Sequence, residues 1–230
     1  MTLREYAARV EERLEQLLPG GGAVVNDAMR YSVMAGGKRL RPAMLLAAAD
    51  MFGGAQEALD FACAVEMIHT YSLIHDDLPG MDDDTLRRGR PTNHVVYGVG
   101  QAILAGDGLL NFAFETMLAA ALKLPGRARP CLEAIAEIAR GAGVTGMILG
   151  QCLDLDSEKN GVPESGREET LERIQQGKTA CMFIYPLRAA CRLCGADAGA
   201  IEALTQYGSA FGLLFQATDD LLDVSGDAAE

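Results

Sequence analysis

The spacing of apolar residues along the chain predicts a protein built from helices. In residues 3–18, apolar side chains recur every three or four positions, which is the repeat of one helix face. Further helices are expected over residues 23–34, 42–51, 56–77, 99–122 and 130–155, then from the end of the polar residues 156–166 to residue 194, and over residues 200–223. No segment alternates apolar and polar residues over a strand's length, so we expect an all-α fold.

Glycines and polar residues interrupt this pattern at four informative places. We expect the 99–122 helix to be interrupted at residues 106–108, where two glycines flank an aspartate. Ser165 and Glu168 have the spacing of a capping box that would open the helix after the polar residues 156–166. A break or kink is expected at residues 177–179, and the segment 80–93 is expected to be polar loop.

Composition favours one helical domain over residues 1–230 and a soluble, cytoplasmic protein. Hydrophobic residues make up 49% of the chain, enough for one substantial core. Residues 1–13 lack the apolar core of a signal peptide, and we expect no membrane span because no uncharged apolar stretch is long enough. The six cysteines lie mostly in apolar segments, which indicates reduced core thiols, and Cys191 with Cys194 does not complete a zinc site.

An acidic segment after the 56–77 helix predicts a divalent-cation site. Its carboxylates are Asp76, Asp77, Asp82, Asp83 and Asp84. We expect Pro79 and Gly80 to bend the chain so that Asp82 returns beside Asp76. Such oxygen ligands suit Mg²⁺, or Mn²⁺, better than zinc, whereas the alternative is an acidic surface loop. His69 and Ser72 share the helical stripe of Asp76 and would face the same site.

A second acidic motif lies in the last predicted helix. Gln216, Asp219 and Asp223 are three and seven positions apart, so they share one helix face, and Asp220 adjoins Asp219. One such motif could be an ordinary helix end. Two of them in one helical chain indicate a pair of carboxylate sites.

Basic residues at glycine-rich loops point to an anionic ligand. The formal net charge of −12 disfavours nucleic acid and anionic membranes as partners, so a polyanionic substrate would need cations placed locally. Arginine's planar fork suits phosphate oxygens, and metal ions held by carboxylates can bind the same oxygens. We therefore expect diphosphate recognition by the cations beside glycines or helix breaks, which are Lys38, Arg39, Arg41, Arg87, Arg88 and Lys178.

These motifs, in order and spacing, resemble the trans-isoprenyl diphosphate synthase family over nearly the whole chain. The motifs are Gly36-Gly37-Lys38-Arg39-Leu40-Arg41-Pro42, Asp76-Asp77 with Asp82 and Leu86-Arg87-Arg88-Gly89, Gly177-Lys178-Thr179, and Phe215-Gln216 with Asp219-Asp220 and Asp223. The resemblance implies the isoprenoid synthase fold, with helices around a central cavity, and a homodimer. The family continues for several helices beyond the second acidic motif, so we expect the C-terminal part to be short here.

The resemblance also implies roles for individual residues. Asp76 and Asp82 would bind magnesium with the support of Asp77, and Asp219, Asp220 and Asp223 would hold a further ion from the opposite wall of the cavity. Arg87 and Lys178 would hold the allylic diphosphate, with Thr179 and Gln216 near its reacting carbon and Gln151, with Asp154, in the inner part of that site. Isopentenyl diphosphate would bind to Lys38, Arg41, His69 and Arg88. His75 and His94 are expected to be structural or to support residues that bind the substrates.

The implied reaction is ionisation of an allylic diphosphate and attack on the cation by the double bond of isopentenyl diphosphate. Tyr71, five positions before Asp76, and its neighbour Ser72 would limit the product, which favours farnesyl diphosphate. The Pro79-Gly80 insertion resembles the bacterial form of the family. Geranylgeranyl diphosphate is the alternative product, and a non-catalytic prenyl-diphosphate-binding subunit is the alternative from another class. A terpene cyclase is disfavoured because it has no use for an isopentenyl site.

Overall fold

The computed structural model describes residues 1–162 and 164–225, without the side chains of residues 219, 220 and 222–225. It divides into two compact units, Met1–Cys131 and Leu132–Glu230. Each unit is mainly helical, which confirms the predicted fold class. The single domain predicted over residues 1–230 stays a prediction.

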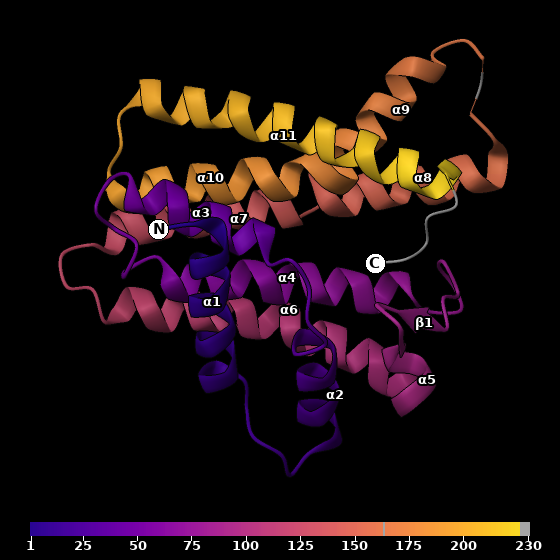
Figure 1. Ribbon diagram of the computed structural model, residues 1–230, viewed down its shortest axis with the longest axis horizontal. Coiled ribbons are helices and arrows are strands. Elements are labelled where there is room, and N and C mark those ends of the chain that lie inside the picture. The colour runs from indigo at the N-terminus through magenta and orange to yellow at the C-terminus, as the bar shows by residue number, and fades with distance from the viewer. Residues whose placement is uncertain (163, 226–230) are drawn as a thin grey trace. The chain divides into compact units, whose positions relative to one another are not determined.

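The first unit is a group of six helices and a small hairpin (Figure 1). The helix α1 has a capping box between Thr2 and Glu5 at its start, and it buries Tyr6, Val10 and Leu14 on one face. The hairpin pairs Leu86 with Pro91 in antiparallel register and was missed because two-residue strands have no detectable alternation. The elements of this unit are α1 (Leu3–Leu17), α2 (Val24–Val33), α3 (Leu40–Asp50), α4 (Leu59–Asp76), β1 (Leu86–Arg87), β2 (Arg90–Pro91), α5 (Asn93–Tyr97) and α6 (Val99–Leu122).

The centre of the first unit is the contact between α4 and α6. The interruption of α6 expected at residues 106–108 is absent, because the helix continues through its glycines. These glycines instead allow close packing. A Cβ on Gly106 would lie 2.1 Å from Nε2 of His75 on α4, and one on Gly108 would lie 3.0 Å from the sulfur of Met29 on α2. These glycines therefore serve helix contact, which is a role that a local breaker rule cannot distinguish from a turn.

One helix within the described residues, α6, is long and apolar enough to cross a membrane by length and composition. It carries Asp107 and Glu115 and packs against α4, α2 and α5. A core helix of a water-soluble protein passes the same test, so this single helix is weak support for a span.

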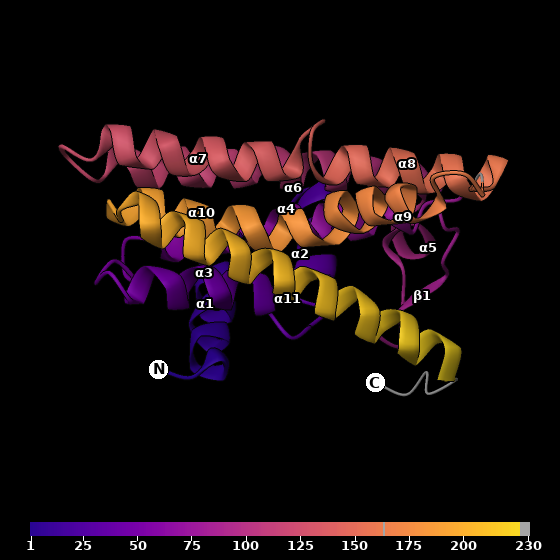
Figure 2. The same ribbon diagram turned by 90° about the horizontal axis from the view of Figure 1, so that it is seen from above.

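The second unit consists of long helices joined by short turns. The helices α10 and α11 contact each other and lie side by side over the first part of α11 in both views (Figures 1 and 2). A buried carboxylate, Glu137, receives hydrogen bonds from Arg188 and Arg192 and ties α7 to α10. The elements are α7 (Ala128–Ala142), α8 (Met147–Asn160), α9 (Arg167–Gln175), the π-helix η1 (Gln176–Ala180), α10 (Cys181–Cys194) and α11 (Ala198–Ser225).

Three predicted features of the second unit change in the structure. The helix expected over residues 130–155 is two helices, because the chain turns at residues 143–146, between Gly143 and Gly146. The predicted capping box is wrong, since α9 begins after Gly166 in the left-handed region and has no side-chain cap. The break expected near Gly177 is a π-helical turn, in which the helix carries one extra residue without ending.

The cysteines behave as core thiols in the part of the chain that the structure describes. None of the six forms a disulfide within the described residues, and four of them are buried. Burial raises the pKa of Cys191 to about 11, which keeps that thiol protonated at neutral pH.

Candidate active site

The acidic segment begins where α4 ends, and the chain folds back on itself there. The amide of Asp82 donates a hydrogen bond to the carbonyl oxygen of Asp76, with an N···O distance of 2.8 Å. The following residue, Asp83, adopts a left-handed conformation with φ of 55°. The sequence prediction that Pro79 and Gly80 return Asp82 to the end of α4 is confirmed at the level of the backbone.

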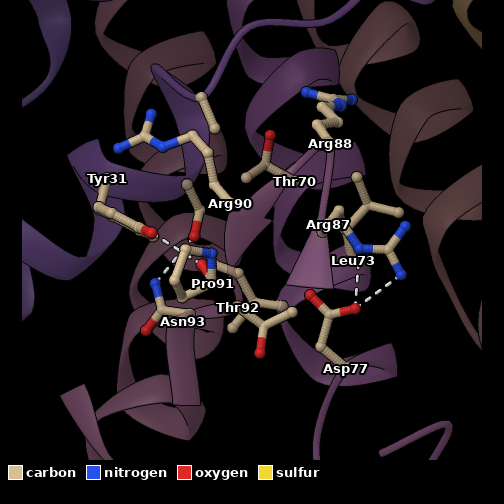
Figure 3. A pocket seen from close by; sticks show the side chains of 13 residues that line it. Tyr31, Thr70, Leu73, Asp77, Arg87, Arg88, Arg90, Pro91, Thr92 and Asn93 are labelled. Atoms are coloured by element: carbon tan, nitrogen blue, oxygen red, sulfur yellow. Dashed lines mark hydrogen bonds and ion pairs between the residues drawn. The ribbon is translucent and has the colours of Figure 1, made fainter. Parts of the chain in front are cut away.

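Asp77 is buried and committed to an ion pair with Arg87. Its Oδ1 accepts from Nε of Arg87 at 2.8 Å and lies 2.6 Å from Nη2 (Figure 3). Burial raises the pKa of Asp77, and the hydrogen bond and charge of Arg87 offset part of that rise. The metal role predicted for Asp77 stays a prediction. Its ion pair with Arg87 holds the guanidinium in place, and Nη2 of Arg87 also lies 3.6 Å from Oδ2 of Asp84.

The hairpin places two neighbouring arginines in opposite directions. Arg87 turns toward Asp77, whereas Arg88, with φ of 53°, points away from it (Figure 3). Arg88 donates a hydrogen bond to the carbonyl oxygen of Gly36, in the basic loop that precedes α3. Burial and the nearby arginines lower the pKa of Arg88, although Glu66 and Glu11 act in the other direction. Since an arginine remains charged in any case, the site holds a desolvated cation.

Arg41 and His69 meet on the facing sides of α3 and α4. Nη1 of Arg41 lies 3.3 Å from Nε2 of His69. A guanidinium can only donate, so His69 accepts at Nε2 and carries its proton at Nδ1 when neutral. The pKa of His69 lies well below its usual value because burial, and then the charges of Arg41 and Arg88, disfavour the imidazolium. Lys38 is exposed in the loop that ends where α3 begins.

A small pocket lies between α2, α4 and the hairpin (Figure 3). Arg90 lies over the ring of Tyr31, 4.6 Å from its centre, and the hydroxyl of Tyr31 donates to the carbonyl of Pro91. The amide nitrogen of Asn93 donates to the carbonyl oxygen of Ala28 and to the hydroxyl of Ser32, which fixes the start of α5 to α2. Sequence reasoning missed these residues, because the contacts join segments about 60 positions apart.

Arg39 is the one expected diphosphate ligand of the first unit that the structure places elsewhere. Only 4% of it is exposed, and it forms ion pairs with Glu66 on α4 and Glu11 on α1. The expectation that all the loop cations face a ligand was therefore wrong for this residue. A lone glutamate within the apolar α4 was the sequence signal that a buried cation should be sought.

In the second unit, the predicted site residues Lys178 and Thr179 lie on the π-helical turn, and each contacts a side chain of another helix. Nζ of Lys178 lies 2.6 Å from Oδ2 of Asp154 on α8. The hydroxyl of Thr179 donates to Oε1 of Gln216 on α11 at 2.7 Å. The predicted cluster of Lys178, Thr179 and Gln216 is thus brought together around η1.

Two glycines allow α8 to approach this turn at backbone distance. A Cβ on Gly150 would lie 2.1 Å from the backbone nitrogen of Lys178, and one on Gly177 would lie 2.7 Å from Cα of Gly150. Next to this contact, Nε2 of Gln151 is buried without a hydrogen-bond partner among the described residues. A buried amide donor without a partner suits a site that a polar ligand or water completes.

The second acidic motif lies on α11, which is helical through Ser225. The side chains of Asp219, Asp220 and Asp223 fall outside the part that the structure describes. Their predicted role in metal binding therefore stays a prediction.

The residues at the end of α4 suit magnesium in a particular way. Within the described residues, no group of three or more histidine, cysteine or acidic side chains could hold a metal ion. Mg²⁺ usually binds proteins through one or two carboxylates, waters and the phosphates of a substrate, and it does not need a cage of side chains. The backbone hydrogen bond between Asp82 and Asp76 holds these two residues close together, and their role as such a pair of ligands stays a prediction.

Comparisons with known proteins place this geometry in context. The model of the polyprenyl synthetase family matches residues 23–230. A "geranylgeranyl pyrophosphate synthase, chloroplastic" of Capsicum annuum is 47% identical over 90% of this chain, and the chain spans 55% of that relative's length. A farnesyl diphosphate synthase of Haemophilus influenzae is 43% identical over 99% of the chain and 77% of its own length.

Solved structures agree on the fold. A crystal structure described as an FPP/GFPP synthase from Zymomonas mobilis has a TM-score of 0.90 and 36% identity, covering 96% of this chain and 80% of that one. A geranyltransferase from Legionella pneumophila has a TM-score of 0.89 and 34% identity, over 99% of this chain and 80% of that one. The predicted isoprenoid synthase fold is therefore confirmed.

Proposed function

This chain belongs to the polyprenyl synthetase family, and we propose that it is a trans-prenyltransferase that joins isopentenyl diphosphate to an allylic diphosphate. The observation that carries the proposal is the juxtaposition at the end of α4. There, the Asp76–Asp82 turn adjoins a hairpin whose two arginines are fixed in opposite directions. Carboxylates for a metal ion and cations for two diphosphates are what such a reaction needs.

Isopentenyl diphosphate is proposed to bind at the basic loop. Lys38, Arg41 and Arg88 would hold its phosphates, and Arg88 is already attached to this loop through Gly36. His69, neutral because of its lowered pKa, would orient Arg41 without adding a charge of its own. Arginine's fork fits two phosphate oxygens at once, which gives this subsite direction as well as charge.

The allylic diphosphate is proposed to bind to Arg87 and Lys178, each of which has an acidic partner that fixes its position. Asp76 and Asp82 would hold Mg²⁺ or Mn²⁺, with Asp77 in support through Arg87, and Asp219, Asp220 and Asp223 would hold a further ion. When bound, the metal supplies Lewis-acid stabilisation of the leaving diphosphate. The side chains then keep the departing anion in place.

The new carbon–carbon bond forms because the allylic cation is positively charged and attracts the electrons of a double bond. The carbon–oxygen bond of the allylic substrate breaks with its electron pair on the diphosphate, and the double bond of isopentenyl diphosphate attacks the cation. One proton leaves the new chain, and the released diphosphate accepts it. Thr179, Gln216 and Gln151 would lie near the cation, where hydroxyl and amide dipoles can stabilise it without reacting.

Farnesyl diphosphate is the proposed product, and Tyr71 and Ser72 are the proposed determinants of its length. Tyr71 is buried on α4 and stands edge-on to His75, with ring centres 5.7 Å apart, while Ser72 bonds back to the carbonyl of His69. A rigid aromatic ring of this kind limits the length of a growing chain. The alternative product is geranylgeranyl diphosphate, which is supported by the 47% identity to a protein with that activity in its name.

We also propose that the protein acts as a cytoplasmic homodimer, as is usual for the family. Analytical ultracentrifugation at micromolar concentration tests this directly. A monomer throughout would contradict it.

One assay tests the proposed reaction. Radiolabelled isopentenyl diphosphate is incubated with Mg²⁺ and dimethylallyl, geranyl or farnesyl diphosphate, and the products are sized by chromatography. Incorporation ending at fifteen carbons supports the proposal, and ending at twenty supports the alternative product. Folded protein that incorporates label with none of the primers would refute the reaction.

A further inference from the structure

Arg39 interrupts the basic loop with an unusual backbone and an inward side chain. Its φ is 48° and its ψ is 34°, which is the left-handed region that non-glycine residues avoid, and α3 begins at the next residue. Only 4% of the residue is exposed, whereas Lys38 beside it is exposed. The turn at Arg39 therefore sends neighbouring cations in different directions.

Three elements of the first unit hold the Arg39 guanidinium. Nη1 donates to Oε1 of Glu66 on α4 at 2.6 Å, and Nε donates to Oε2 of Glu11 on α1 at 2.7 Å. Nη2 donates to the carbonyl oxygen of Val33 at the end of α2. Glu66 is itself only 2% exposed. All three nitrogens of the fork are thus used within the protein.

A buried ion pair of this kind is poorly explained by stability alone. Desolvation of two charges offsets most of their attraction, and well-packed apolar residues often stabilise a fold as much. What the pair supplies is attachment, because a planar fork bonded at three nitrogens ties residue 39 to α1, α2 and α4. The backbone of this residue carries Lys38 on one side and Arg41, two residues later, on the other.

We propose that Arg39 is a positioning residue, which, through Glu66 and Glu11, fixes the loop so that Lys38 and Arg41 meet the isopentenyl diphosphate. This inference rests on the proposed function of the loop. Arg39 itself does not touch the substrate. Substitution of Arg39 should therefore weaken the binding of isopentenyl diphosphate and leave the binding of the allylic diphosphate unchanged.

The test uses paired substitutions that leave no lone buried charge. Arg39→Met with Glu66→Met removes the pair, and Arg13→Met with Asp60→Met removes a matched pair that also joins α1 to α4 but does not contact the loop. For the Arg39 double variant, we expect the KM for isopentenyl diphosphate to rise about tenfold or more, the effect of a small misplacement. The KM for the allylic substrate and kcat should change about twofold or less, because the substitution weakens only the binding of isopentenyl diphosphate, and does so equally in the ground state and the transition state.

Arg39→Lys, which keeps the charge but not the fork, should give an intermediate rise in the same KM. If the double variant loses its helical circular dichroism signal, this variant carries the test alone. An unchanged KM for isopentenyl diphosphate, equal rises for both substrates, or the same pattern in the Arg13 double variant would overturn the inference. If the unsubstituted protein shows no turnover, the proposed function fails, and calorimetric binding of isopentenyl diphosphate to the same variants decides the role of Arg39 separately.

Discussion

Gly37 leaves open the space that the side chain of Arg88 occupies. Its φ is 127°, and a Cβ built there would lie 2.6 Å from Nη1 of Arg88. Gly36, one residue earlier, also has positive φ, at 85°, but its Cβ would meet nothing within 4 Å. The two glycines therefore have similar backbone demands and differ in the space beside them.

Gly37→Ala should raise the KM for isopentenyl diphosphate by roughly tenfold, because the new methyl group displaces Arg88 from the basic loop. Gly36→Ala is the matched control. Both variants should lose about 1–3 kcal/mol of unfolding free energy from backbone strain, measured by urea denaturation. Equal KM values in the two variants would show that Arg88 does not depend on this contact.

His69 should make folding sensitive to mild acid. Burial and the nearby arginines lower its pKa below the ordinary histidine value of 6.5 in the folded protein, so below about pH 6.5 the unfolded chain binds the proton more readily. Stability from this group is complete above pH 6.5 and decreases as the pH falls, by up to about 1.4 kcal/mol per pH unit.

Urea denaturation of the protein and of His69→Gln between pH 8 and pH 5 measures that contribution. The difference at pH 8 reports the packing change alone and is subtracted. The stability of His69→Gln should then depend less steeply on pH. Parallel curves would contradict the assignment.

Tyr71→Ala should lengthen the product beyond fifteen carbons. The residue is buried against His75 on α4, and removal of its ring opens space for a longer chain. Tyr71→Phe keeps the ring and should keep the product. Chromatographic sizing checks both variants, and an unchanged product from Tyr71→Ala would exclude Tyr71 as the length determinant.

The role of a residue could be predicted where it depends on its neighbours in a sequence motif. It was missed where it depends on burial against distant segments. The return of Asp82 to Asp76 followed from Pro79 and Gly80, since a local bend depends on local sequence. Arg39 was read as a ligand because its motif neighbours are cations. Its partners Glu11 and Glu66 lie 28 and 27 positions away, and no local pattern reports such a distance.

At the scale of elements, apolar spacing located the helices well and located their ends less well. The bounds of α6 match the predicted 99–122, because its apolar run is long and Gly98 and Lys123 adjoin its two ends. Residues 130–155 read as one helix because Gly143 and Gly146 are also tolerated inside helices. A glycine's role depends on which element packs against it, and the sequence does not show that neighbour.

Gly150→Ala tests this dependence in the second unit. The new Cβ would lie 2.1 Å from a backbone nitrogen of η1, which cannot rotate away as a side chain can. We expect a loss of about 1–3 kcal/mol of stability, the usual cost of overpacking, together with a lower kcat because Lys178 and Thr179 move with the turn.

Gly100→Ala is the control for this substitution. It also lies in a helix, α6, but nothing lies within 4 Å of its Cβ, so it should stabilise the protein by about 0.5–1 kcal/mol. Thermal unfolding and steady-state kinetics measure both. Wild-type values for Gly150→Ala would show that α8 and η1 are less closely packed than the structure indicates.

At the scale of the whole molecule, charge governs ligand binding. The chain carries a net charge of −12, yet its proposed substrates are diphosphates. The proposed metal ligands Asp76 and Asp82 would give a metal ion only part of its coordination, so metal and diphosphate should bind together. Neither alone should stabilise the protein much.

Differential scanning calorimetry with Mg²⁺, with inorganic diphosphate, and with both tests this coupling. Both together should raise Tm clearly, by the equivalent of about 2.7 kcal/mol at a hundredfold excess over Kd, while each alone gives a small shift. Asp82→Asn should abolish the joint effect. Additive shifts from the two ligands would contradict the proposed metal bridge.

The π-helical turn at Gln176–Ala180 has a consequence for how such a site can evolve. It adds one residue to a helix that continues on both sides, so side chains before and after it differ in phase by about 100°. Deletion of a single codon there would restore a regular helix and rotate Lys178 and Thr179 relative to the buried face of α10. The direction of these side chains can thus change in one mutational step while the helix that carries them is kept.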